Sequence, residues 1–103
     1  MRLKSIFIFT IFLTVCVIGC LSQIVSIDEY TKDWIGRPIE ELKQIMARPE
    51  SYASRIKWKE VTYQLDNGNW VFVEPDRKDC FIHWEVNPKG IIVGYRLEGD
   101  RCY

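Results

Sequence analysis

The stretch of sequence that decides the fold is Val61-Thr-Tyr-Gln-Leu-Asp-Asn-Gly-Asn-Trp-Val-Phe-Val73. Apolar and polar residues alternate along its first half, as they do in a strand that buries one face. The Asn67-Gly68 dipeptide tolerates the positive φ angles of a type I′ turn, so the whole stretch predicts a β-hairpin. A turn at these two residues sets Tyr63 opposite Phe72, an aromatic pair of the kind that stabilises sheets.

A second hairpin is predicted from Cys80 to Leu97, with its turn at Asn87-Pro-Lys-Gly90. Alternation assigns one set of side chains to the buried face, namely Ile82, Trp84, Val86, Ile91, Val93 and Tyr95. The opposite face then carries Phe81, His83, Glu85, Ile92 and Arg96. The two hairpins together give four antiparallel strands, joined by a charged connector over residues 74–79.

Two short helices are predicted before the sheet. Ser26 followed by Glu29 forms a capping-box pattern, which indicates a helix over about residues 27–33. Pro38 suits the first turn of a second helix, which has apolar residues at three- and four-residue spacing and stops before Pro49. Residues 50–57 are polar and indicate a loop. Residues 26–103 are therefore predicted to form one α+β domain, with two short N-terminal helices packed on a four-stranded antiparallel sheet.

The beginning of the chain indicates export. Arg2 and Lys4 precede an apolar run over residues 6–18, which is shorter than the ~20 residues of a membrane-spanning helix. The run ends in Val17-Ile18-Gly19-Cys20, which resembles the bacterial lipobox. An uncleaved N-terminal anchor helix with an incidental cysteine is the alternative interpretation.

The lipobox resemblance implies a lipoprotein signal peptide over residues 1–19, a lipid on the Cys20 thiol, and a lipidated tether over residues 20–25. Two or three acyl chains hold a protein durably on a bilayer, because each buried CH₂ contributes about 0.8 kcal/mol. The expected location is the cell envelope. Because Leu21 rather than an aspartate follows the cysteine, we expect the outer membrane, facing the periplasm, if the source is Gram-negative.

The charge balance argues against a nucleic-acid partner. The chain has 14 basic and 14 acidic residues. Removal of residues 1–19 takes away Arg2 and Lys4, which leaves 14 − 2 = 12 basic residues against 14 acidic ones. The mature part has a formal charge of −2 on that count, and it lacks the basic footprint of a nucleic-acid-binding domain.

Cys80 and Cys102 are the two cysteines outside the anchor. In an oxidising compartment such a pair is expected to form a disulfide, and two free buried thiols are the alternative. The bond requires the chain to bend at Glu98-Gly99-Asp100, since a straight strand would carry Cys102 past its partner. His83 is the only histidine, so we expect no zinc site. The acidic residues Glu74, Asp76 and Asp79 lack the spacing of a calcium loop, so we expect no other metal, and we expect no cofactor.

The stretch Trp34-Ile-Gly-Arg-Pro-Ile-Glu-Glu-Leu42, placed between a lipobox and a sheet, resembles the SmpA/OmlA (BamE-like) lipoproteins. The wider resemblance is to the β-lactamase-inhibitor-protein-like fold, whose members bind other proteins. The resemblance therefore implies a non-enzymatic, membrane-anchored module for protein binding or envelope assembly. Its expected partners are the lipid bilayer, through acylated Cys20, and another envelope protein.

Trp34 and Trp58 are the candidate partner-binding residues, because both lie at the ends of predicted elements and tryptophan is enriched at interaction hot spots. One alternative function is inhibition of an envelope hydrolase of the lysozyme or β-lactamase type. Another is a small enzyme that uses His83 with Glu85, two positions along the same face. Otherwise His83 is expected to be a surface histidine on the open face of the sheet. A purely structural role in the envelope is the remaining alternative.

Overall fold

The computed structural model describes residues 26–103, and in it three short helices precede a four-stranded antiparallel sheet. This is the α+β class that the sequence predicts. The helices are α2 (Ile27–Trp34), α3 (Ile39–Met46) and α4 (Tyr52–Arg55). The strands are β1 (Val61–Gln64), β2 (Trp70–Arg77), β3 (Cys80–Val86) and β4 (Ile92–Glu98), in the spatial order β1-β2-β3-β4.

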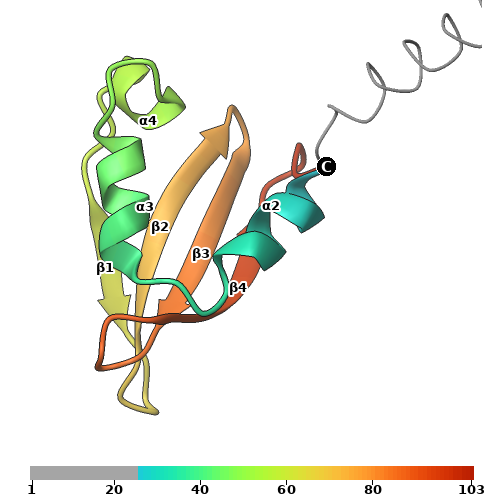
Figure 1. The fold of residues 1–103 in the computed structure, drawn as a ribbon. Coiled ribbons are helices and arrows are strands. Elements are labelled where there is room, and N and C mark those ends of the chain that lie inside the picture. Colours follow the sequence, from blue (N-terminus) through green and yellow to red (C-terminus); the bar gives the residue numbers. More distant parts are fainter. Residues whose placement is uncertain (1–25) are drawn as a thin grey trace, which may run out of the picture.

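The predicted signal peptide (1–19), Cys20 and the tether (20–25) lie outside the described residues. Within residues 26–103, no helix has the length and apolar character that crossing a membrane requires. Figure 1 shows α2 and α3 on one face of the sheet, with α4 beyond the end of α3. The core between these layers consists of Ile27, Trp34, Ile39, Leu42, Phe72, Cys80, Ile82, Trp84, Val86 and Ile92.

Helix α2 begins and ends as its sequence predicts. The Ser26 hydroxyl oxygen accepts a hydrogen bond from the Glu29 backbone N–H at 3.4 Å, which caps the first turn. After the helix, Gly36 takes a φ of 90°, a conformation that residues with a Cβ rarely adopt. Its N–H donates to the Ile92 carbonyl oxygen at 2.7 Å, and the Ile92 N–H donates to the Arg37 carbonyl oxygen at 2.9 Å. The linker between α2 and α3 is thereby tied to the start of β4.

The predicted loop over residues 50–57 is wrong, because α4 lies inside it. Ser51 explains the extra helix. Its hydroxyl accepts from the Ser54 backbone N–H at 3.1 Å and donates to the Met46 carbonyl oxygen at 2.6 Å. One side chain thus caps the start of α4 and satisfies a carbonyl at the end of α3. The domain has three helices before the sheet rather than two.

The register predicted for the first hairpin is wrong by one residue. Tyr63 pairs with Val71, and Phe72 pairs with Thr62. The Leu65 N–H donates to the Asn69 carbonyl oxygen at 2.9 Å, so the strands are joined by a longer loop than a two-residue turn. The Asn67 side chain stabilises this loop by accepting from the Asn69 N–H at 3.0 Å. Tyr63 consequently lies on the opposite face from the one that Phe72 buries.

In the second hairpin, the prediction that Ile82, Trp84 and Val86 are buried is confirmed. The pairing across to β4 is not the predicted one, because the register shifts between Glu85 and Val86. Trp84 pairs with Tyr95 and Val86 pairs with Ile92, which leaves Val93 as an extra residue. Ile92, opposite Val86, is fully buried and Val93 is 44% exposed, so the two residues exchange their predicted positions.

Candidate functional site

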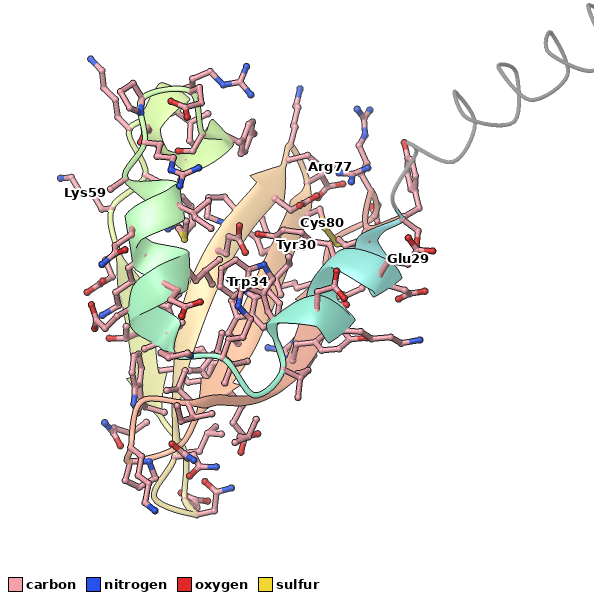
Figure 2. All side chains as sticks on the ribbon, in the orientation of Figure 1. Glu29, Tyr30, Trp34, Lys59, Arg77 and Cys80 are labelled. Atoms are coloured by element: carbon pink, nitrogen blue, oxygen red, sulfur yellow. A yellow bond between two sulfur atoms is a disulfide. The ribbon has the colours of Figure 1, made fainter. Side chains whose placement is uncertain are left out.

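Trp34, one of the two predicted partner-binding residues, lies in the core. It is only 4% exposed, which contradicts the exposure expected at the end of a helix. Figure 2 shows Tyr30 and Trp34 pointing from α2 toward the sheet. The Arg37 guanidinium covers the Trp34 ring, with its carbon 3.8 Å from the ring centroid. The side chain is therefore occupied by packing within the domain.

Trp58, the other predicted residue, is partly exposed and lines a groove of about 280 Å³ between α3, α4 and β2. Apolar side chains form much of the groove, and they are Met46, Ala47, Ala53 and Phe72. Polar and charged side chains complete it, and they are Lys43, Ser54, Lys57 and Glu60. The Trp58 ring also packs against Phe81, with the two ring centroids 5.6 Å apart.

The end of α4 places Trp58 in this groove. Lys57 takes a left-handed φ of 57°. Its N–H donates to the Ser54 carbonyl oxygen at 3.2 Å, and the Trp58 N–H donates to the Ala53 carbonyl oxygen at 2.9 Å. These two bonds form a Schellman motif, which fixes the residue after the left-handed one against the helix it follows.

The Trp58 indole N–H is the one buried side-chain donor or acceptor of residues 26–103 that lacks a hydrogen-bond partner. At the rim of the groove, the Lys43 ammonium lies 3.6 Å from a carboxylate oxygen of Glu40 and 3.6 Å from one of Glu60. The groove therefore combines an apolar lining with a charged edge, and one of its lining residues carries a buried, unsatisfied donor.

A second cluster of polar side chains lies on the sheet face opposite α2 and α3, and it is centred on His83. His83 lies on the open face of the sheet, as expected, but neighbouring side chains cover it: its side chain is only 11% exposed and both ring nitrogens are hydrogen-bonded. The Nε2 atom lies 2.8 Å from Glu98 Oε1, and the Nδ1 atom lies 2.8 Å from the Tyr63 hydroxyl. An Arg96 Nη2 lies 3.2 Å from the same Nδ1 and 3.4 Å from the Tyr63 hydroxyl.

The predicted contact between His83 and Glu85 is wrong. Glu85 accepts hydrogen bonds from the side-chain amides of Asn67 and Asn69, at 3.3 and 2.6 Å. The carboxylate that meets the imidazole comes instead from Glu98, at the end of β4. The hydrogen bond and charge of His83 hold the pKa of Glu98 below its ordinary value. The cluster borders a hollow of about 190 Å³, lined by Tyr63, Leu65, Val71, His83, Glu85, Tyr95 and Arg96.

Glu74 is a buried acid that the sequence does not reveal. The prediction of a connector over residues 74–79 is wrong, because β2 continues to Arg77 and only the turn into β3 remains. Glu74 is 8% exposed and faces the core, where it accepts from the Tyr30 hydroxyl and from the Trp84 indole N–H, both at 2.9 Å. Burial raises the pKa of Glu74 to about 7, and Asp76 adds to the shift. Burial together with the Glu74 charge raises the pKa of Tyr30.

Cys80 and Cys102 are placed as a disulfide pair, with their Cα atoms 5.0 Å apart. The bend that this pairing requires is present at Gly99, which has a φ of 122°. A Cβ at this position would fall against the backbone carbonyl of Asp79. The formation of the bond in the cell stays a prediction. Across residues 26–103 no three potential ligands gather in a way that could hold a metal ion.

Comparison with known proteins gives no relative: no family model, no curated protein and no solved structure matches this chain. The resemblance to BamE-like lipoproteins therefore stays a prediction that depends on the quoted sequence pattern.

Proposed function

We propose that this chain is a membrane-anchored envelope lipoprotein, and that its 26–103 domain binds another envelope protein without catalysing a reaction. The observation that carries the proposal is the apolar groove lined by Trp58, whose buried indole N–H has no hydrogen-bond partner among residues 26–103. The expected occupant is an apolar side chain of the partner, accompanied by a main-chain carbonyl that accepts from this N–H when binding turns the indole outward.

The energetics of the groove favour such an occupant. A buried donor without a partner costs about 1–3 kcal/mol, and an incoming carbonyl oxygen would remove that cost. An apolar side chain that fills the groove would add about 1.5–3 kcal/mol through burial. Lys43 and Glu60 at the rim resemble the polar border that surrounds the central anchors of protein interfaces.

The lipid anchor supports the same function. A fully extended tether over residues 20–25 reaches roughly 20 Å, at up to ~3.6 Å for each residue. Lipidated Cys20 would therefore hold residue 26, where the domain begins, within roughly that distance of the membrane surface. A partner in the same membrane would meet the domain at a high effective concentration, so a groove of modest affinity would be sufficient.

A photo-crosslinking amino acid in the full-length chain, expressed in intact envelopes, tests the binding proposal. Lys57 is exposed at the edge of the groove, and Lys89 is an equally exposed control in the turn between β3 and β4. We expect one specific adduct from position 57 and none from position 89. Trp58→Phe, which keeps an aromatic ring but removes the N–H, should weaken that adduct.

Equal labelling at both positions, or no adduct at position 57, would contradict the groove as a docking site. A captured lysozyme or β-lactamase would instead favour the hydrolase inhibitor. The anchor is tested separately by metabolic labelling with a radioactive fatty acid. Cys20→Ser should abolish the label, because the lipid is attached to a thiol, and undiminished label would contradict the lipoprotein interpretation.

A further inference from the structure

The hydrogen bonds around His83 can be assigned from the groups that can only accept or only donate. The Glu98 carboxylate can only accept, so the imidazole Nε2 must carry the proton that lies between them. A neutral imidazole then has an unprotonated Nδ1, which accepts from the Tyr63 hydroxyl at 2.8 Å and also lies 3.2 Å from Arg96 Nη2, a group that can only donate. The Tyr63 oxygen in turn accepts from Arg96 Nη2 at 3.4 Å. Hydrogen bonds thus connect four side chains in a row, from the Arg96 guanidinium through Tyr63 and His83 to the Glu98 carboxylate.

In this order the Tyr63 hydroxyl directs its proton at His83 Nδ1. Transfer of the phenol proton to Nδ1 creates a phenolate beside the Arg96 guanidinium and an imidazolium beside the Glu98 carboxylate. The phenolate is attracted by the Arg96 guanidinium and the imidazolium by the Glu98 carboxylate, while Arg96 Nη2, 3.2 Å from Nδ1, repels the imidazolium. A hydroxyl, a histidine and an orienting carboxylate in this sequence form the arrangement that activates nucleophiles in many hydrolytic enzymes.

The site is also accessible. Tyr63 is 38% exposed on strand β1, and it borders the 190 Å³ hollow. Arg96 is exposed and forms no ion pair among residues 26–103, so its charge is not neutralised by a direct carboxylate contact there. A small molecule in the hollow would meet the phenol oxygen and the guanidinium together.

We propose that Tyr63 is an activated nucleophile, and that a small activated ester with an anionic group acylates its hydroxyl oxygen. In the reaction the Tyr63 oxygen attacks the carbonyl carbon, and a new carbon–oxygen bond forms. The bond from that carbon to the leaving alcohol breaks, and the alkoxide departs with its electron pair. The phenol proton passes to His83 Nδ1 and from there to the leaving group, so the histidine returns to its neutral form.

The roles of the four residues follow from their places in the chain. His83 accepts the proton, and Glu98 holds the imidazole in the tautomer with an unprotonated Nδ1. Arg96 attracts the anionic group of the ester. The product is a single covalent ester on Tyr63. The inference does not depend on protein binding at the Trp58 groove, because the two sites share no lining residue.

The experiment treats the full-length protein with p-nitrophenyl acetate and with the anionic mono-p-nitrophenyl succinate at pH 7, and maps the acylated residues by mass spectrometry. Tyr103, which is 75% exposed, serves as the internal reference. A general base contributes typically 10²–10⁴-fold, so Tyr63 should be acylated at least about tenfold faster than Tyr103. The anionic ester should show the larger ratio.

Variants separate the relay from simple exposure. Glu98→Gln should lower the rate at Tyr63 toward that of Tyr103, and His83→Phe should do the same. Glu85→Gln is the matched control, because Glu85 lines the same hollow without touching His83. Arg96→Gln should slow the anionic ester more than the neutral one.

Because Glu98 is 57% exposed, its replacement leaves the packing intact, and the result can be read even if His83→Phe fails to fold. Acylation of Tyr63 no faster than that of Tyr103 would overturn the proposal. Equal effects of Glu98→Gln and Glu85→Gln would overturn it as well. Either result would leave the crosslinking test of the Trp58 groove unaffected.

Discussion

Glu74 gives the domain a stability that should fall as the pH rises. Its pKa is raised from an ordinary value of 4.5 to about 7 in the folded protein, because the carboxylate is 8% exposed and loses its hydration. The unfolded chain releases this proton near pH 4.5, whereas the folded chain keeps it until about pH 7. The stabilising effect of the protonated acid is therefore complete below pH 4.5 and is lost as the pH rises through 7.

The magnitude follows from the difference between the two pKa values. One pH unit corresponds to about 1.4 kcal/mol, so a difference from 4.5 to about 7 gives roughly 3 kcal/mol between pH 4.5 and pH 8. Glu74→Gln removes this titration and keeps the contacts. The amide oxygen can accept from the Trp84 indole N–H, and the amide nitrogen can donate to the Tyr30 hydroxyl.

The assay is urea denaturation of the full-length chain in a nonionic detergent, followed by tryptophan fluorescence at several pH values. We expect Glu74→Gln to gain roughly 3 kcal/mol over the natural protein as the pH rises from 4.5 to 8. Glu50→Gln, at an exposed position that forms no ion pair within residues 26–103, is the control and should show a constant difference. A Glu74→Gln difference that does not change with pH, or that changes in the opposite direction, would refute the reasoning.

Two further perturbations probe the C-terminal end of the sheet. Reduction of the Cys80–Cys102 pair, separated by 22 residues, should lower the free energy of unfolding by roughly 3 kcal/mol, and mass spectrometry of non-reduced, alkylated protein should find no modified thiol at either position. Gly99→Ala should lower the free energy of unfolding by at least about 1–3 kcal/mol, because its Cβ would meet the Asp79 carbonyl. Gly68→Ala shares the positive φ but has open space around it, so its smaller loss in the same denaturation assay isolates the effect of the clash.

Local signals in the sequence were sufficient for the elements that local chemistry determines. Ser26 caps α2, and the alternation of β3 places Ile82 and Trp84 in the core, as predicted. Helix α4 was missed although its signal is present, because Ser51 is a capping residue in a segment too short to show helical periodicity. A serine before a run without proline or glycine is the pattern that could have revealed it.

Glu74 could not be assigned from the sequence for a different reason. A glutamate next to a proline within a charged segment is typical of a solvated connector. Its burial depends on two donors from distant elements, the Tyr30 hydroxyl of α2 and the Trp84 indole of β3. The Tyr30 contact spans 44 positions of sequence, and no local pattern carries information over that distance.

The acylation site depends on the two features of register that the sequence pattern left open. With a two-residue turn, Tyr63 would share a face with Phe72 and could not reach His83. The longer loop of the first hairpin moves its side chain to the other face. In the second hairpin, the predicted register would set Arg96 opposite Phe81. In the structure, the shift of Val86 to Ile92 and the extra residue at Val93 together bring Arg96 opposite His83. Both departures from the simplest hairpin thus act on the same four side chains.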